Sequence, residues 1–151
     1  MRPKLIRKTV NLKNLNHLSE IFQLYDTYII DLWGVMHDGI SLNPSAIETI
    51  EKLNENSKKV VFLSNAPRPS AKVVNFLKKI KMNEKLLSKV VTSGEAAMLA
   101  INKKKFGEKF YHLGPSRDNS IFEKVIQSKT TLEKCDFILC TGIFDDYDQD
   151  I

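Results

Sequence analysis

Short apolar runs alternate along the chain with longer segments in which apolar residues recur at helical spacing. A short run bounded by polar residues is typical of a buried strand, and a 3.6-residue spacing is typical of an amphipathic helix. The runs predict strands at residues 27–32, 59–63, 89–91, 109–113 and 136–140. The intervening segments predict helices near residues 15–25, 44–53, 70–80, 93–100 and 117–127. Such alternation predicts an α/β fold built on a parallel sheet.

Capping residues mark the starts of two of these helices. Asn43 is placed to cap one of them, with Pro44 at the first helical position, where its missing N–H is tolerated. Thr92 and Glu95 have the spacing of a capping box, in which each side chain bonds a backbone N–H of the other residue. Three helices have apolar faces expected to point inward, formed by Leu15, Leu18, Phe22 and Tyr25, by Ile47, Ile50 and Leu53, and by Val73, Val74, Phe76, Leu77 and Ile80.

The composition is that of a globular domain. The 151 residues are 42% hydrophobic and 27% charged, which is ordinary for one domain with a core of its own. No apolar run approaches the roughly 18–20 residues that a membrane-spanning helix needs, so we expect no membrane partner. The basic N-terminus lacks the apolar stretch of a signal peptide, and the default expectation is therefore a cytoplasmic location.

The positive charge is scattered along the chain. Lysines give a formal net charge of +5, but they occur in small groups at the ends of expected helices and beside strands. Nucleic-acid binding needs a clustered basic face with interleaved aromatic residues, so we expect no nucleic-acid partner and only a mild attraction for small anions. Cys135 and Cys140 lie five positions apart and point to opposite faces of one strand, which predicts buried free thiols in a reducing compartment.

Polar residues follow the first two expected strands at the point where each strand ends. Asp31 ends the first strand, and Ser64 and Asn65 end the second. Ligands of parallel sheets lie beyond the carboxyl ends of neighbouring strands, so Asp31 and Ser64 are expected to face one crevice. A carboxylate can attack phosphorus or hold Mg²⁺, and a hydroxyl and backbone amides can bind phosphate oxygens. Taken singly, each feature is better explained as a turn or loop former; together, in order and followed by the expected helices, they favour phosphoryl transfer.

Three motifs, in order along the chain, carry a family resemblance. They are Asp31-x-Trp33-Gly34-Val35-x-x-Asp38-Gly39, then Phe62-Leu63-Ser64-Asn65, then Thr92-Ser93-Gly94-Glu95-Ala96. The set resembles the haloacid dehalogenase (HAD) superfamily, most closely its class IIA branch of NagD-like sugar and nucleotide phosphatases and a subgroup with Asp-Leu-Trp-Gly-Val as its first motif. The later runs Leu113-Gly114-Pro115-x-Arg117-Asp118 and Cys140-Thr141-Gly142 resemble the start of that subgroup's cap domain.

The resemblance implies a fold and a division into domains. The fold would be a HAD-type, Rossmann-like α/β core with an incomplete parallel sheet, followed by the beginning of a C2-type α/β cap. Residues 1–104 would form the N-terminal part of the core, and residues 105–151 the truncated start of the cap. In class IIA a charge-offsetting Lys and an acidic metal-binding pair follow the cap, and the context of Asp145-Asp146 matches the cap instead. The chain would then be the N-terminal half of a longer enzyme, and a complementing C-terminal polypeptide would be a partner.

The resemblance also implies roles for individual residues. Asp31 would be the catalytic nucleophile, which forms an aspartyl-phosphate, and would also bind Mg²⁺ as a metal ligand. The backbone carbonyl of Trp33 would be a second ligand of that metal. The phosphoryl group of a small phosphorylated metabolite would be bound by Ser64, Asn65 and Gly34, while Gly39 would belong to the flap that positions the cap.

Trp33 departs from the family pattern, since it stands where the family has a second acid that protonates the leaving group and then activates water. An indole N–H cannot exchange protons near neutral pH, and the loss of general acid–base catalysis typically costs about 10²–10⁴ in rate. His37 or Asp38 could take this role, although a solvated His and a turn-capping Asp explain the two residues better.

Three functions remain open from the sequence. The first is a Mg²⁺-dependent HAD-type phosphatase that acts on a small phosphorylated metabolite and is weak or inactive alone. The second is a non-catalytic remnant, or a phosphate- or nucleotide-binding module of a split gene, which Trp33 and the missing Lys and acidic motifs favour. The third is a receiver-type domain with an acceptor Asp, which the loop at residues 33–39 fits poorly.

Overall fold

Two parallel sheets organise the chain in a computed structural model, which describes residues 14–87 and 89–142. The first sheet has the strand order β1-β2-β3, and the second pairs β4 with β5. Every predicted strand is found to within one residue. The strands are β1 (Thr27–Asp31), β2 (Lys59–Ser64), β3 (Lys89–Thr92), β4 (Phe110–Leu113) and β5 (Phe137–Cys140), and the α-helices are α1 (Pro44–Glu55), α2 (Ser70–Lys79) and α3 (Ser93–Asn102).

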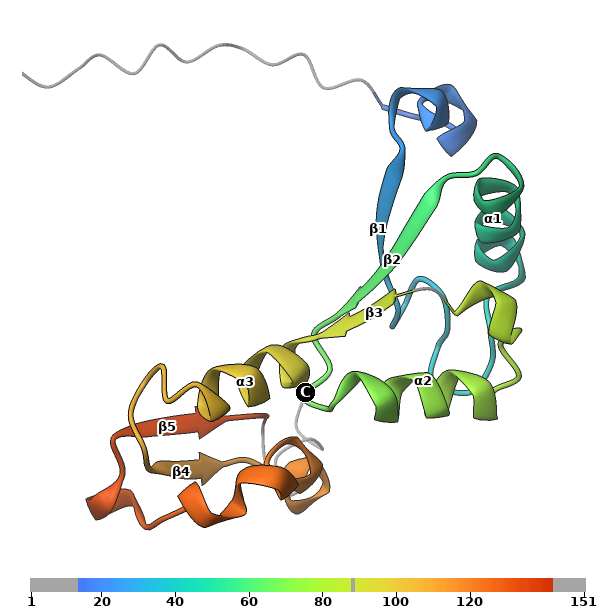
Figure 1. Cartoon of the computed structure of the whole chain (residues 1–151). Helices are drawn as coiled ribbons and strands as arrows, with labels where there is room; N and C mark the ends of the chain where they lie inside the picture. Colours follow the sequence, from blue (N-terminus) through green and yellow to red (C-terminus); the bar gives the residue numbers. More distant parts are fainter. Residues whose placement is uncertain (1–13, 88, 143–151) are drawn as a thin grey trace, which may run out of the picture.

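Helices α1 and α2 lie on the same side of the first sheet (Figure 1). Side chains alternate across a strand, so Phe62 of β2 points to the helices and is fully buried, whereas its neighbour Leu63 points the other way and is 49% exposed. Ile29 of β1 shares the open face and is 68% exposed. The core on the helical side consists of Leu32, Met36, Ile50, Leu53, Val60, Phe62, Val73, Leu77, Met82 and Leu86. No described element covers the opposite, open face of this sheet.

The second sheet has a separate core, to which α3 contributes. Ile101, near the end of α3, packs with Phe110 of β4 and with Val125. α3 therefore joins the two sheets, as Figure 1 shows. Both cysteines are free thiols, but Cys135 is half-buried and lies before β5 and Cys140 is exposed, so the predicted burial is wrong for Cys140 and only partial for Cys135. The reason is that Cys140 lies on the face of β5 turned away from the core.

The helix predicted at residues 15–25 is replaced by two short 3₁₀ turns, Leu18–Glu20 and Phe22–Leu24. Local side-chain bonds account for the difference. The Nδ1 atom of His17 accepts the N–H of Ser19 at 3.1 Å, and the Glu20 carboxylate accepts the N–H of Asn16 at 2.9 Å. Such bonds cap a tight turn and compete with a longer helix.

The helix predicted at residues 117–127 is likewise divided, into the 3₁₀ segments Ser116–Ile121 and Glu123–Ser128. The break falls at Phe122, whose φ of −124° is not helical. An α-helix would turn Phe122 roughly 100° away from Ile121. The break instead lets both side chains enter the second core, where they are 1% and 2% exposed. Asp145-Asp146 lies outside the described residues.

The starts of α2 and α3 are bonded to each other at the carboxyl edge of the first sheet. The Thr92 hydroxyl accepts the N–H of Glu95 at 3.0 Å, as the predicted cap requires, and donates to the Arg68 carbonyl at 2.6 Å. The Glu95 carboxylate accepts the N–H of Ser70 at 3.1 Å, so it caps α2 and not its own helix. The loop after β2 is thereby fixed between two helix starts.

Gly94 makes this arrangement possible, and replacing it by Ala is expected to destabilise the fold. An added Cβ would lie 2.3 Å from the Arg68 backbone nitrogen and 2.6 Å from its carbonyl carbon, so backbone would have to move. Overpacking of this kind costs about 1–3 kcal/mol, despite the better helix propensity of Ala. Urea unfolding of Gly94→Ala measures the effect. The Ala96→Gly exchange at an exposed position of the same helix measures the difference in helix propensity between Ala and Gly alone. Equal stability of Gly94→Ala and wild type would contradict the close approach of Gly94 to the Arg68 backbone.

Candidate functional site

The turn after β1 is tightly closed and anchored in the core. The Leu32 carbonyl accepts the N–H groups of Met36 at 2.8 Å and His37 at 3.2 Å, and the side chains of Leu32 and Met36 are each 1% exposed. Gly34 has a φ of +78°, a region that favours glycine, and its N–H donates to the His37 carbonyl at 2.8 Å. The turn therefore brings His37 back beside Trp33.

Asp31 ends β1 on the open face of the sheet. Its Oδ1 atom accepts the N–H of Leu32 at 2.7 Å, which leaves Oδ2 without a protein donor among the described residues. Asp31 lines a cavity of about 620 Å³ together with Ser64, Asn65 and Ser93. The structure thus brings Asp31 and Ser64 to one crevice at the carboxyl edge of β1, β2 and β3, where the sequence predicted that they would meet.

Ser64 and Asn65 form the other wall of this cavity. The Ser64 hydroxyl is 7% exposed and accepts the N–H of Ala66 at 3.2 Å. The Ser93 hydroxyl donates to the Asn65 carbonyl at 2.8 Å and to the Ala66 carbonyl at 3.0 Å, which ties the loop to α3. Within the described part of the chain the Asn65 side-chain amide makes no hydrogen bond, so it is available to a ligand.

A second cavity, of about 370 Å³, adjoins the first and shares Ser64 and Asn65 with it. No carboxylate lines this second cavity, whereas Arg68 and Lys72 both do. Its walls are therefore suited to an anion. The lining residues also include Trp33, His37 and Gly39 of the turn after β1.

Trp33 projects from the turn and is 67% exposed. Its indole Nε1 lies beside Gly39, 3.6 Å from the position a Cβ atom there would occupy. Gly39 itself has a φ of +95°, so glycine is favoured at this position. Trp33 thus lines the second cavity with an indole and contributes no carboxylate to it.

Asp38 stabilises a turn, which is one of the two roles that the sequence left open for it. Its Oδ1 atom accepts the N–H groups of Ile40 at 2.8 Å and Ser41 at 2.7 Å. These bonds hold the pKa of the Asp38 carboxyl below its usual range. Asp38 does not line the cavity beside Trp33, so it is a poor replacement for the absent acid.

His37 is buried, and its interpretation as a solvated side chain is wrong. The residue is 6% exposed, its Nδ1 atom accepts the N–H of Gly39 at 3.0 Å, and its ring meets the Phe76 ring edge to face at 5.2 Å. Burial lowers the pKa of His37 below its ordinary value, and this effect outweighs the opposing influence of the Asp38 and Asp31 carboxylates. A lone polar residue in a loop gave no signal in the sequence that it would be packed against α2.

The described residues include no group of three or more His, Cys, Asp or Glu side chains that could hold a metal ion. Two hard oxygen atoms are nevertheless close together in sequence at the end of β1: the free Oδ2 of Asp31 and the carbonyl of Trp33, which accepts no hydrogen bond in the described structure. Such a pair suits Mg²⁺, which commonly takes one or two protein oxygens and fills its remaining positions with water and substrate phosphate.

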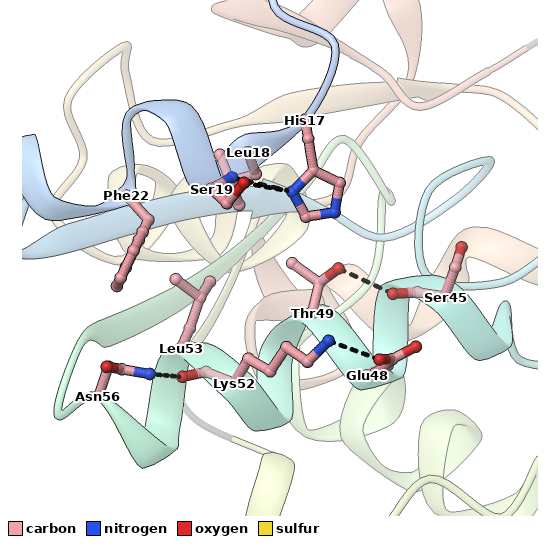
Figure 2. A pocket seen from close by; sticks show the side chains of 10 residues that line it. All are labelled: His17, Leu18, Ser19, Phe22, Ser45, Glu48, Thr49, Lys52, Leu53 and Asn56. Carbon is pink, nitrogen blue, oxygen red and sulfur yellow. Dashed lines mark hydrogen bonds and ion pairs between the residues drawn. The ribbon is translucent and has the colours of Figure 1, made fainter.

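A further cavity, of about 250 Å³, lies between α1 and the 3₁₀ turns that precede β1 (Figure 2). Its polar groups are paired with one another. Lys52 bonds Glu48 at 2.6 Å, and the Thr49 hydroxyl donates to the Ser45 carbonyl at 2.8 Å (Figure 2). Because these groups are satisfied within α1, the cavity is explained by imperfect packing of the turns on the helix.

Comparison with known proteins agrees with the fold. The haloacid dehalogenase-like hydrolase family model matches residues 28–126, and no curated protein matches the chain. A haloacid dehalogenase-like hydrolase from Brucella suis 1330 aligns with a TM-score of 0.74 and 25% identity over 87% of this chain and 51% of its own. The 4-nitrophenylphosphatase of Thermotoga maritima aligns with a TM-score of 0.60 and 26% identity over 80% and 46%. NagD from E. coli K-12 shares the fold, with a TM-score of 0.54 and 21% identity over 82% and 48%.

The chain spans about half the length of these solved structures. The family match covers most of the chain and includes Asp31, Ser64 and the start of α3. In the described residues, no helix has the length and apolarity needed to cross a bilayer. The chain therefore belongs to the haloacid dehalogenase-like hydrolases, and it shares its fold with their NagD-like members.

Proposed function

We propose that this chain carries the nucleophile and the phosphate-binding loop of a Mg²⁺-dependent phosphatase that acts on a small phosphorylated metabolite. The observation that carries the proposal is the meeting of Asp31, Ser64 and Asn65 in one cavity at the carboxyl edge of the sheet. A carboxylate with one unbonded oxygen, a hydroxyl and an unbonded amide are suited to nucleophilic attack on a bound phosphoryl group. The phosphatase named among the similar structures supports the reaction class.

The reaction would proceed in two displacements at phosphorus. An oxygen of the Asp31 carboxylate would form a bond to phosphorus while the bond to the ester oxygen breaks, and the departing alkoxide would take a proton from water. A water molecule would then attack the aspartyl-phosphate, which releases inorganic phosphate and restores the carboxylate. Ser64 and Asn65 would hold the phosphoryl oxygens, and Gly34, whose N–H is bonded to His37, would shape the turn beside them.

Asp31 and the Trp33 carbonyl would hold the Mg²⁺ ion. The ion supplies charge neutralisation to the phosphoryl group when it is bound. Both donors are oxygens at the end of β1, in keeping with the preference of Mg²⁺ for oxygen ligands.

A complementing C-terminal polypeptide would complete the first sheet, and residues 105–151 would be the beginning of a cap. Parallel sheets are normally covered on both faces, yet Ile29 and Leu63 are exposed on the face opposite α1 and α2. β1 is also an edge strand, so a further strand could pair with it. The length of the similar structures supports this proposal, because the chain spans about half of each.

Hydrolysis of 4-nitrophenyl phosphate tests the proposed function. The full chain is assayed with Mg²⁺, alone and after mixing with the proposed complementing C-terminal polypeptide, and again after the metal is removed with a chelator. We expect turnover that requires Mg²⁺ and increases when the second polypeptide is present. Chelator-resistant hydrolysis would contradict the proposed metal dependence.

A second candidate function is phosphate binding without turnover. It is favoured by one specific observation, the absence of a carboxylate from the cavity that contains Trp33. This alternative predicts binding of inorganic phosphate near Ser64 with no hydrolysis in any preparation, including the mixture with the proposed complementing polypeptide.

A further inference from the structure

The buried imidazole of His37 has one ring nitrogen that the fold leaves without a hydrogen bond. Nδ1 accepts the N–H of Gly39 at 3.0 Å, but Nε2 has no hydrogen-bond partner among residues 14–87 and 89–142. The residue is 6% exposed, so water reaches it poorly. A buried polar atom without a partner is unfavourable, and in native structures it commonly has a functional explanation.

The bond from Gly39 fixes the tautomer of this ring. A backbone N–H can only donate, so Nδ1 must be the unprotonated acceptor, and the proton of the neutral ring must lie on Nε2. With Nδ1 unprotonated, the ring is neutral in this structure. The contact with Phe76, at 5.2 Å between ring centroids, further limits rotation of the ring. His37 is therefore a positioned N–H donor.

The residues around the His37 ring indicate what kind of group would accept the hydrogen bond from Nε2–H. His37 lines the cavity of about 370 Å³ that also contains Arg68, Lys72 and the phosphate-loop residues Ser64 and Asn65. No carboxylate belongs to that lining, although the Asp38 and Asp31 carboxylates act on His37 from outside it, so the walls of the cavity provide positive charge and donors. An oxygen of an anionic group is the acceptor that these walls would attract.

We propose that His37 binds substrate by donating from Nε2–H to an oxygen of the phosphoryl group or of the ester leaving group. This inference rests on the proposed function and extends it with a residue beyond Asp31, Ser64, Asn65 and Gly34. In this role the ring stays neutral and transfers no proton. It stabilises negative charge on the oxygen through a hydrogen bond. His37 thus does not restore the acid–base step that Trp33 cannot perform, but it strengthens phosphate binding.

Two amide substitutions separate this role from a structural one. In His37→Asn the side-chain oxygen lies near the position of Nδ1 and can accept the Gly39 N–H, but the donor at Nε2 is lost. In His37→Gln the side-chain nitrogen reaches the region of Nε2, and the short acceptor to Gly39 is lost. A binding role predicts that Asn is the more harmful substitution, and a role confined to holding the turn predicts the opposite order.

The experiment uses the full chain, inorganic phosphate and Mg²⁺, with amide resonances of Ser64 and Asn65 as reporters of binding. A long-range ¹H–¹⁵N spectrum of free wild type is expected to show the Nε2–H tautomer of His37. On phosphate addition the Nε2–H proton resonance is expected to move downfield. Losing a hydrogen bond to a charged group should weaken phosphate binding about 10-fold or more in His37→Asn, whereas His37→Gln should stay within about 3-fold of wild type.

The possible failures are distinguishable. Equal phosphate affinities of wild type and His37→Asn, or an Nδ1–H tautomer in the free protein, overturn the role of His37 and leave the proposed function standing. A greater loss in His37→Gln than in His37→Asn also overturns it, in favour of the structural role. Absence of phosphate binding by wild type overturns the proposed function together with this inference. Thermal unfolding of each variant shows that a loss of binding is not a loss of fold.

Discussion

Replacing Asp31 by Asn is expected to abolish phosphoryl transfer, with a fall in the rate of 4-nitrophenyl phosphate hydrolysis of about 10³-fold or more. The amide oxygen can still accept the N–H of Leu32, as the Oδ1 atom does at 2.7 Å, so the turn should keep its shape. What is lost is the negative oxygen that we propose attacks phosphorus. Steady-state hydrolysis, measured with and without the complementing C-terminal polypeptide, gives the ratio of rates.

Beryllofluoride extends this test to a preparation that does not turn over, because it forms an analogue of an aspartyl-phosphate on an active carboxylate. A bound ¹⁹F resonance is expected for wild type and not for Asp31→Asn. Asp38→Asn is the matched control: its amide oxygen can still accept the N–H groups of Ile40 and Ser41, so binding and hydrolysis should change little. A bound resonance that persists in Asp31→Asn would show that another residue is the nucleophile.

The elements that surround Asp31 could be predicted from the sequence because local patterns determine them. The short apolar runs ending at Asp31 and at residue 64 favour strands, and two parallel strands in register bring their carboxyl ends to one edge. The helix that starts after Asn43 carries Pro44 and an inward apolar stripe, so its start and its buried face could both be predicted. The predicted capping bond from the Asn43 side chain is absent, because its Oδ1 atom instead accepts the Ser45 hydroxyl. The meeting of Asp31 with Ser64 follows from these elements alone.

The parts that could not be predicted depend on contacts between distant residues. His37 carries no pattern that distinguishes a solvated side chain from one packed on Phe76, which lies much further along the chain, in α2. The bond from Ser70 to Glu95 joins two helix starts, so the spacing of Thr92 and Glu95 predicted a cap but not which helix the carboxylate would cap. The division of residues 116–128 into 3₁₀ segments follows from the shape of the second core.

Helices α1 and α2 cover one face of the first sheet, and no described element covers the other. The open face is relevant to whether the chain acts alone. Asp31 lies on the open face, beside Leu63 in the register of β1 and β2. A polypeptide that covered this face would therefore also enclose the carboxylate and remove water from around it. Exclusion of water strengthens the electrostatic interactions of a bound phosphoryl group. In this proposal, the same polypeptide therefore covers the open face of the sheet and encloses the site around Asp31.

Truncating the neighbouring residues Phe62 and Leu63 to Ala is expected to give opposite results. Phe62 is fully buried against α1 and α2, so Phe62→Ala should lower the free energy of unfolding of the chain alone by about 3–5 kcal/mol. Leu63 is 49% exposed on the open face, so Leu63→Ala should cost less than about 1 kcal/mol in the same measurement. Urea unfolding followed by circular dichroism gives both values.

Leu63→Ala is expected to have a larger effect when the proposed complementing C-terminal polypeptide is present. If that polypeptide covers the open face, it buries Leu63, and a buried Leu side chain contributes about 1.5–3 kcal/mol. Leu63→Ala should then weaken association of the two polypeptides about 10-fold or more, as measured by titration calorimetry. Unchanged association would show that the second polypeptide does not dock on this face. Equal stabilities of Phe62→Ala and Leu63→Ala in the chain alone would contradict the one-sided burial of the sheet, on which the docking argument depends.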